Sequence, residues 1–191
     1  MNAKNKTGPL KGLIVLDLTR VLAGPYASMI LSDLGARIIK VEPPLGDDSR
    51  EFSPFVNNQS AYFASLNREK ESIKLDLKSE KDKLIFEELI KNADVLLENY
   101  KPGTMEKLGY GYKSLTKKYP NIIYASCSGF GQTGPWASKP AYDMIVQGMG
   151  GLMSVTGHES QEPVRVGTSI GDITAGLFTT IGILASLIDK N

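Results

Sequence analysis

One aspartate of this sequence stands between small residues at the start of a long apolar stretch, in the run Gly171-Asp172-Ile-Thr-Ala-Gly176. Asp is among the favoured N-cap residues, so spacing alone makes Asp172 a candidate cap of a helix over 172–189. The same place suits a nucleophilic carboxylate, because a helix N-terminus and its N–H groups favour the ionised form. Gly171 and Gly176 would then let a substrate approach closely. Both interpretations remain open on spacing alone.

Three further runs carry polar groups next to predicted strands. The run Arg20-Val-Leu-Ala-Gly-Pro25 follows a strand and could present N–H groups to an anion, or be a tight turn with Pro25 at the first helical position. The run at 98–103 (ENYKPG) suits an adenine or a pantetheine amide, and is equally a plain turn. Arg68, Lys70 and Lys78 flank another predicted strand, where charges are more often solvated edge protection than ligands.

Other kinds of site have little support. Cys127 and His158 are the one cysteine and the one histidine, so they cannot build a tetrahedral zinc site or an intramolecular disulfide within one chain, and no metal site is predicted. His158 lies in a polar turn without a G-x-S-x-G elbow, and Cys127 follows a buried strand as a packed thiol would. The sequence has neither a G-x-G-x-x-G nor a Walker A loop.

Composition narrows the class of protein. Among 191 residues, 22 are Lys or Arg and 21 are Asp or Glu, a formal charge of +1 that gives no general attraction to nucleic acid or an anionic membrane. The first ten residues lack the apolar core of a signal peptide, and the apolar stretch 173–188 is interrupted and shorter than the ~20 residues of a membrane span. We therefore expect a soluble, cytoplasmic protein of one domain.

Apolar periodicity predicts alternating strands and helices. A strand, a helix and a second strand within about 30 residues form a βαβ unit, whose strands must be parallel. The predicted fold is therefore α/β, a Rossmann-like parallel sheet flanked by helices. The predicted strands cover 13–18, 37–42, 72–77, 94–98 and 121–126, and the predicted helices cover 25–34, 80–92, 141–147 and 172–189, with short helices within 103–118.

Two helices carry more detailed expectations. A capping box, Ser79 with Asp82, is expected to open the helix over 80–92, with Leu84, Ile85, Phe86 and Leu89 buried. In the helix over 172–189, one apolar stripe is formed by Ile173, Leu177, Ile181, Leu184 and Ile188. The conformation of 43–59 is left open.

Eight runs of the sequence occur in an order that is itself informative. They are 10–20 with Ala23-Gly-Pro25, 34–43, Gly46-Asp47 to Arg50, Asn67-Arg68 to Lys78, Asn99-Tyr100 to Gly103, Ser128 to Pro135, Ala141-Tyr-Asp143, and Gly171-Asp172. Together they resemble the class III CoA-transferase family, which includes formyl-CoA transferase, carnitine CoA-transferase and the α-methylacyl-CoA racemases. This resemblance makes Asp172 the expected catalytic residue.

The resemblance implies a chemistry and a set of contacts. Asp172 would attack an acyl-CoA thioester to give an acyl-aspartyl anhydride and free CoA, and a carboxylic acid would then exchange with the first acyl group. Coenzyme A would be a substrate, and no cofactor is bound permanently. The residues expected at CoA are Val21 and Leu22 in the first loop, Leu75 and Lys78 near the third strand, Asn99, Tyr100 and Lys107 on the nucleotide side, and Ala141, Tyr142 and Asp143 toward the thiol end.

Two departures from the family pattern leave alternatives open. The racemase branch has a His-Asp pair where this chain has Tyr142-Asp143, and a phenol of pKa ~10 is a poor base near neutrality, so transferase is favoured over racemase. Family members are about twice as long, so 1–191 is expected to be an N-terminal CoA-binding domain without the smaller second domain. The expected partner is a second copy in a homodimer or a complementary C-terminal half. The alternatives are a CoA-binding but catalytically incomplete fragment and a racemase-like enzyme.

Overall fold

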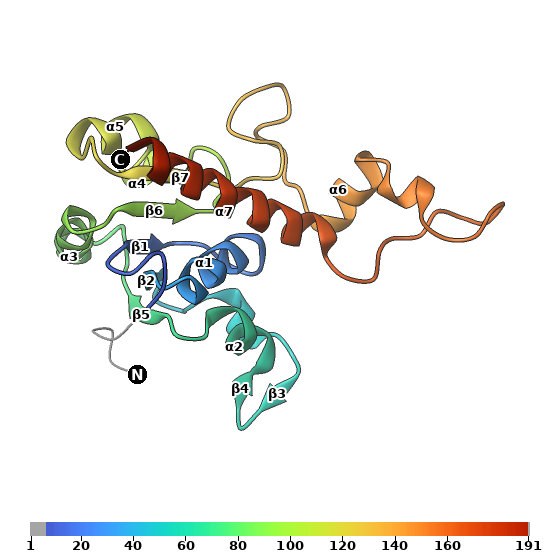
Figure 1. Ribbon diagram of the computed structural model, residues 1–191, viewed down its shortest axis with the longest axis horizontal. Helices are drawn as coiled ribbons and strands as arrows, with labels where there is room; N and C mark the ends of the chain where they lie inside the picture. Colours follow the sequence, from blue (N-terminus) through green and yellow to red (C-terminus); the bar gives the residue numbers. More distant parts are fainter. Residues whose placement is uncertain (1–6, 191) are drawn as a thin grey trace.

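Five short apolar runs pair into one parallel sheet in the computed structural model, which describes residues 7–190 (Figure 1). The order in the sheet is β5-β2-β1-β6-β7, and each pair is parallel, so each connection crosses over through helical segments. The strands are β1 (Ile14–Asp17), β2 (Arg37–Glu42), β5 (Glu71–Lys74), β6 (Val95–Glu98) and β7 (Ile123–Ser126). The predicted α/β fold, a parallel sheet flanked by helices, is confirmed.

Helices cover both faces of this sheet (Figure 1). The region 43–59, left open by the sequence, leads into a separate two-stranded hairpin of β3 (Phe55–Val56) and β4 (Gln59–Ser60), and the helix that follows it was not predicted. The helices are α1 (Ala23–Asp33), α2 (Ala61–Asn67), α3 (Glu80–Lys91), α4 (Thr104–Leu108), α5 (Tyr112–Lys118), α6 (Asp143–Met149) and α7 (Ile170–Lys190), with short 3₁₀ helices η2 (Asp48–Glu51) and η3 (Leu152–Val155). The first ten residues, which we expect not to be a signal peptide, lie mostly outside the described residues.

The alternation of side chains along the strands divides the core into two layers. Val15 of β1 faces α1 and α7, where it packs in one cluster with Leu31 and Ile183. Leu16, the next residue, faces α3, α4 and α5 and packs in a second cluster with Phe86. Strand order reverses between β1 and β6, the point where an α/β sheet offers a crevice at the carboxyl ends of its strands.

The first turn of α1 differs from the prediction. The helix begins at Ala23, so Pro25 is its third residue and not its first. Gly24 is packed so closely on Thr19 that an added Cβ would lie 2.2 Å from the Thr19 side chain. The Gly-Pro pair therefore belongs to the packed helix start, and the loop is the shorter, half-buried segment just before it. At the other end of this helix, Gly35 takes the left-handed conformation expected of a helix stop.

Two expectations for α3 are wrong. The side chain of Ser79 makes no cap hydrogen bond, and Asp82 instead accepts one from the backbone N–H of Asp76. The buried residues are Phe86 and Ile90, one turn apart, whereas Leu84 is 70% exposed and Ile85 is also exposed. The helix lies on the sheet through this narrow stripe, with Leu89 packed at its margin.

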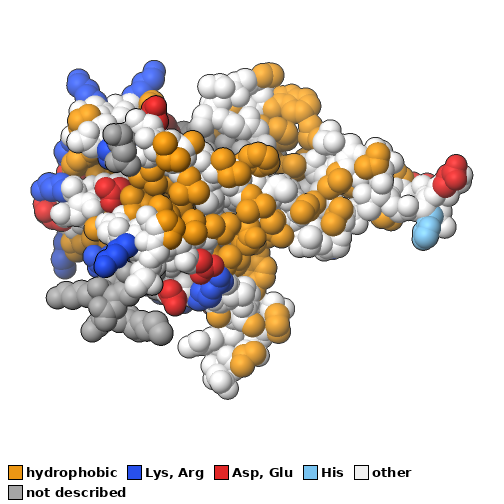
Figure 2. Space-filling view, in the orientation of Figure 1, with side chains coloured by type: hydrophobic (Ala, Val, Ile, Leu, Met, Phe, Trp, Pro, Cys, Tyr) orange, Lys and Arg blue, Asp and Glu red, His pale blue; other side chains and the backbone are white. Residues whose placement is uncertain are grey.

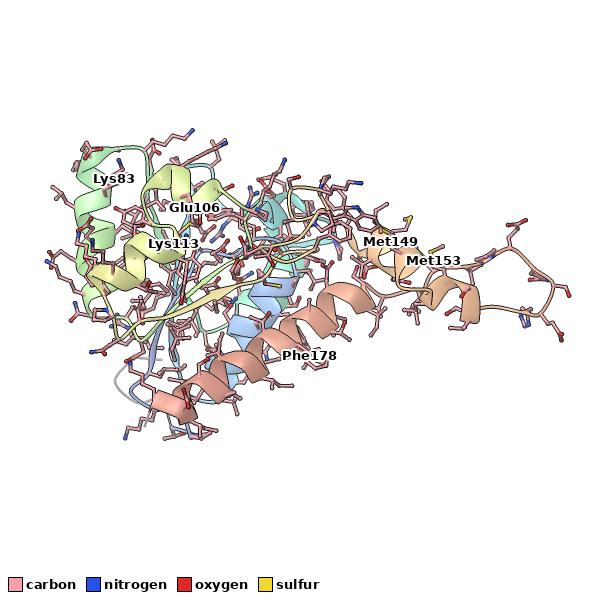
Figure 3. The ribbon with its side chains drawn as sticks, turned by 90° about the horizontal axis from the view of Figure 1, so that it is seen from above. Lys83, Glu106, Lys113, Met149, Met153 and Phe178 are labelled. Atoms are coloured by element: carbon pink, nitrogen blue, oxygen red, sulfur yellow. The ribbon has the colours of Figure 1, made fainter. Side chains whose placement is uncertain are left out.

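The orientation of α7 also differs from the prediction. The helix begins at Ile170, so Asp172 is its third residue and not its N-cap. Its buried face is Gly176, Thr180 and Ile183, while Leu177, Ile181 and Ile188 of the predicted stripe are exposed. Figure 2 shows hydrophobic side chains gathered on the side where α7 lies, and Phe178, labelled in Figure 3, is exposed there too.

Gly176 explains this orientation. An added Cβ at Gly176 would lie 2.6 Å from the carbonyl oxygen of Ala23 and 3.0 Å from the Tyr26 ring. The missing side chain lets α7 approach α1 closely, and this contact decides which face is buried. Gly176 therefore serves helix packing, and the expectation that it opens space for a substrate is wrong.

With 21 residues, α7 is long and apolar enough by length and composition to cross a membrane, contrary to the expectation that no stretch reaches that length. The predicted apolar run covered 173–188, and the helix extends beyond it at both ends. Only 17% of this apolar stretch is buried within the described structure. In this structure α7 packs Ile183 into the core beside α1.

Candidate functional site

The loop that follows β1 is held in an unusual conformation. Val21 has φ 66°, a left-handed conformation that is a true outlier for a β-branched residue. The side chain of Asn99, which follows β6, donates to the carbonyl of Arg20 and accepts from its N–H, each at 2.8 Å. The N–H of Val21 donates to the Asp47 carboxylate at 3.3 Å. Side chains from two other segments thus hold the backbone of this turn.

A buried group of charges lies beneath the loop. The ammonium of Lys40 pairs with Asp47 at 2.8 Å and donates to the carbonyl of Thr19 at 2.7 Å. Lys70 pairs with Asp17 at 3.2 Å, and all four charged side chains are almost fully buried. Burial alone would raise the pKa of Asp17, but Lys70 and Lys40 outweigh it and hold that pKa at about 2. These paired charges fix the loop from below.

Lys70 corrects one interpretation of the sequence. Its side chain is 1% exposed and also donates to the Ser28 hydroxyl at 2.8 Å, so it is not solvated edge protection. Burial lowers the pKa of Lys70 to about 8, even though Asp17 raises it. The solvated interpretation holds for Arg68, which makes a surface ion pair with Asp33, and for the exposed Lys78.

Asp172 lies half-buried on the first turn of α7. Its pKa is raised, first by burial and then by the nearby carboxylate of Asp143 from α6. The pKa shift is therefore opposite to the one that the helix end alone would cause, and the expectation that Asp172 is ionised at neutral pH stays a prediction. Asp143 accepts a hydrogen bond from the N–H of Gly171 at 2.7 Å, so this second carboxylate takes one of the free N–H groups of the helix start.

Two further groups lie within electrostatic reach of Asp172. Burial raises the pKa of the Tyr62 phenol on α2, and the charge of Asp172 raises it further. Burial also raises the pKa of the Cys127 thiol, to which Asp172 again contributes, and Thr179 shares a hydrogen bond with that thiol. Nothing in the sequence pattern singled out Tyr62, because only the fold brings α2 toward the start of α7.

Comparison with known proteins decides the family. The model of CoA-transferase family III matches residues 10–191. This chain belongs to CoA-transferase family III. It is 55% identical over 182 residues to the acetyl-CoA:oxalate CoA-transferase of Acetobacter aceti, covering 94% of this chain and 47% of that protein. It is 48% identical over 184 residues to the succinyl-CoA:glutarate CoA-transferase of Mus musculus, covering 95% of this chain and 42% of that protein.

A solved structure agrees with this family. The crystal structure of a CAIB/BAIF family protein from Brucella suis matches with a TM-score of 0.92 and 43% identity, covering 97% of this chain and 50% of that one. The chain thus spans about half the length of the relatives it matches. Its N-terminal position in the family, expected from the motifs, agrees with that coverage.

The CoA contacts expected from the family fall into groups in this structure. Asn99 hydrogen-bonds to the backbone of Arg20, the residue directly before Val21. The guanidinium of Arg20 lies over the Tyr100 ring, 5.6 Å from its centroid. Leu75 is buried in the same core cluster against which Tyr100 packs. Val21, Asn99 and Tyr100 lie where β1 and β6 end, at the reversal of strand order, whereas Leu75 follows the edge strand β5.

The remaining expected contacts are less closely joined. Leu22 is half-buried before α1, and Lys78 and Lys107 are exposed at the surface. Tyr142 is 76% exposed beside the half-buried Ala141. All of these CoA contacts remain predictions, and those grouped around Arg20 have the most definite geometry.

A cavity of about 820 Å³ lies beside the carboxyl ends of β6 and β7, and Glu98, Lys101, Pro102 and Gly103 of the run 98–103 line part of it. Glu106 of α4 and Lys113 of α5, both labelled in Figure 3, line it together with the half-buried Tyr124. Asp172 is not among its lining residues, and neither are Asn99 and Tyr100, the two residues of that run expected at CoA. We therefore place the candidate active site at Asp172 and the loop after β1, because the interacting polar groups lie there.

Proposed function

We propose that this chain is the part of a CoA-transferase that binds acyl-CoA and carries the reacting carboxylate, Asp172. Membership of CoA-transferase family III supports a transferase. The observation that supports the role of Asp172 is its environment, a half-buried carboxylate on the first turn of α7, beside Asp143. No other aspartate combines these features with the family motif Gly171-Asp172.

The proposed reaction proceeds through an anhydride. A carboxylate oxygen of Asp172 bonds to the thioester carbonyl carbon, the carbon–sulfur bond breaks, and CoA leaves as the thiolate. An incoming carboxylate then attacks the aspartyl carbonyl of this anhydride and displaces the first acid. The CoA thiolate attacks the new acyl carbon, which forms the second thioester and returns Asp172 as a carboxylate.

The electrostatics of the site favour this route. Burial and the Asp143 charge both act against the ionised form of Asp172, which is why its pKa is raised. Conversion to an anhydride removes that negative charge, so the same environment that strains the free carboxylate favours the covalent intermediate. Water must also be kept away, because hydrolysis would release the stored thioester energy.

We further propose dicarboxylic acids as the acids exchanged. The similar proteins from Acetobacter aceti and Mus musculus are named for oxalate and glutarate, with acetyl-CoA and succinyl-CoA as the CoA donors. Acetyl-CoA with oxalate is the first pair to test, since that relative is 55% identical.

The partner in this proposal is a second copy or a C-terminal half. The exposed apolar side chains of α7, among them Leu177, Phe178 and Ile181, support a covered surface in the assembled enzyme. Light scattering after gel filtration, for the chain alone and with the second half of a family member, distinguishes a homodimer from a complex of two halves.

We also propose that the protein works in the cytoplasm.

A transfer assay tests the proposed activity. The chain, alone and with a C-terminal half, is given acetyl-CoA or succinyl-CoA and labelled oxalate or glutarate, and the labelled thioester is measured. We expect transfer that is lost in Asp172→Asn. If the chain binds CoA but shows no transfer, alone or with a C-terminal half, the alternative of a CoA-binding chain without its own activity is favoured. Solvent deuterium at the α-carbon of a 2-methylacyl-CoA would favour the racemase-like alternative.

A further inference from the structure

A buried glutamine on α6 connects to the segment that leads into α7. Gln147 is 2% exposed, and its side-chain oxygen accepts from the N–H of Val166 at 2.8 Å. A backbone N–H can only donate, so this bond fixes which end of the amide is oxygen. The amide nitrogen must then face two acceptors, the Asp143 carboxylate at 2.6 Å and the carbonyl of Thr168 at 3.4 Å.

Asp143 continues this connection to the helix that carries Asp172. One of its carboxylate oxygens takes the donor from Gln147, and the other accepts from the N–H of Gly171 at 2.7 Å. A Cβ on Gly171 would lie 3.0 Å from that oxygen, so the absence of a side chain permits the contact. Two side chains of α6, one turn apart, therefore hold the backbone at residues 166, 168 and 171.

This arrangement lies at one end of the molecule, where α6 stands beside the start of α7 (Figure 1). Between these two helices the chain passes through η3 and an exposed turn around His158 before it returns along α6. The returning segment has no regular secondary structure, so it has few backbone hydrogen bonds of its own. Its position therefore depends on the bonds to Gln147 and Asp143.

We propose that Gln147 is a positioning residue for Asp172: it holds Asp143 against the N–H of Gly171 and thereby fixes the first turn of α7. The inference rests on the proposed function, in which Asp172 is the reacting carboxylate. Family motifs did not single out Gln147, whose side chain hydrogen-bonds to Asp143, Thr168 and Val166.

The inference has an electrostatic consequence that simple packing would not have. The Asp143 charge is the second cause of the raised pKa of Asp172, after burial. The amide N–H₂ of Gln147 stabilises that charge and holds it in place. The other titratable groups near Asp172 are Tyr62 from α2 and Cys127 after β7, and neither is bonded to Gln147. Without the amide, Asp143 is no longer held against the start of α7; as its charge moves away, the repulsion weakens and the pKa of Asp172 falls.

The test is a carbon-13 carboxylate titration of Asp172 by NMR in the 191-residue chain. Gln147→Met keeps an unbranched side chain and removes both polar groups, and we expect the Asp172 midpoint to fall. Asp143→Asn should lower it as well, and the double variant should match Asp143→Asn alone, since Gln147 acts through Asp143. Gln161→Met, at an exposed glutamine in the turn before this segment, is the matched control and should leave the midpoint unchanged.

The inference is overturned if a folded Gln147→Met protein has the same Asp172 titration midpoint as the wild type. It is also overturned if Gln147→Met and Asp143→Asn shift that midpoint additively. Should Gln147→Met fail to fold, amide hydrogen exchange in the wild-type protein decides: Val166 and Gly171 must exchange slowly, and rapid exchange at either rejects the inference. An acyl adduct on Asp172 is scored separately. A shifted titration without an adduct would reject the proposed function and leave the positioning role intact.

Discussion

The side chain of Asn99 makes two hydrogen bonds, each 2.8 Å long, to the backbone N–H and carbonyl of Arg20. The two residues follow β6 and β1, neighbouring strands at the point where the strand order reverses. The pair therefore ties together the two strand ends between which a ligand of this fold would lie. It also holds the turn in which Val21 takes its left-handed conformation.

Replacing Asn99 tests this tie. We expect Asn99→Ala to leave two backbone groups of Arg20 unpaired, to cost about 1–3 kcal/mol of folding stability, and to weaken CoA binding because the loop loses its fixed shape. Asn99→Asp keeps the acceptor and loses the donor, so its effect should be smaller. Calorimetry with CoA and urea unfolding measure both effects. Asn92→Ala, at the exposed end of α3, is the control. CoA affinity that is equal in wild type and Asn99→Ala would contradict the role of this loop.

Two glycines of α7 make a matched pair for testing helix packing. Gly176→Ala should destabilise the fold by about 1–3 kcal/mol, because the new methyl group meets the backbone of α1. Gly182 has open space around its position, so Gly182→Ala should stabilise the protein by about 0.5–1 kcal/mol through helix propensity. Urea denaturation of both variants measures the difference, and equal effects would show that α7 does not pack as described.

The buried carboxylates predict a loss of stability in acid. The pKa of Asp17 is held at about 2 by Lys70 and Lys40 against the effect of burial, and that of Glu42 is held at about 2 by Arg50 and by Ser72 against the same effect. Since both pKa values lie below their unfolded values, the unfolded chain binds more protons between about pH 4.5 and pH 2. Stability is therefore complete above this window and falls as pH drops through it.

For Asp17 this contribution is on the order of 2 kcal/mol. Urea unfolding at a series of pH values measures the slope. Glu42→Gln, which removes one of the two titrating groups, should flatten the acid part of the curve. A stability that stays constant from pH 5 to pH 2 would be inconsistent with these ion pairs.

The ionised carboxylate of Asp172, unlike those of Asp17 and Glu42, is expected to lower folding stability at neutral pH. Its raised pKa means that the folded state, unlike the unfolded chain, is strained by the ionised carboxylate. Asp172→Asn should raise the melting temperature at pH 7.5, and the gain should shrink as pH falls through the folded pKa, because the wild-type carboxyl then becomes neutral. Asp189→Asn, at an exposed aspartate of the same helix, should have no such effect. A lower melting temperature for Asp172→Asn would contradict the electrostatics of the site.

The regular elements of the fold follow from local patterns in the sequence. β2 matches its predicted bounds, and the other strands begin or end within three residues of theirs, because short apolar runs between turn residues leave few alternatives. The face of α7 could not be predicted in this way. The predicted stripe with Leu177 is more apolar than the buried face, and only the close approach at Gly176 decides the outcome.

The charge and burial of the site residues were even harder to predict from local sequence patterns. Lys70 looks like any basic residue beside a strand, and its burial against Asp17 depends on a residue 53 positions away. A helix start argues for a readily ionised Asp172, yet Asp143 and burial reverse the direction, and Asp143 comes from a separate helix. Motifs located Asp172 and the loop after β1, but charge and burial there are set by contacts between distant segments.

Covalent trapping at Asp172 tests the central claim most directly. The folded chain, shown by calorimetry to bind CoA, is incubated with acetyl-CoA or succinyl-CoA, alone and with a C-terminal half, and then treated with hydroxylamine. Peptide mass spectrometry should find the hydroxamate on Asp172, and Asp172→Asn should lose it. If a protein that binds CoA leaves Asp172 unmodified with both thioesters in both forms, the role of Asp172 as the reacting carboxylate is wrong.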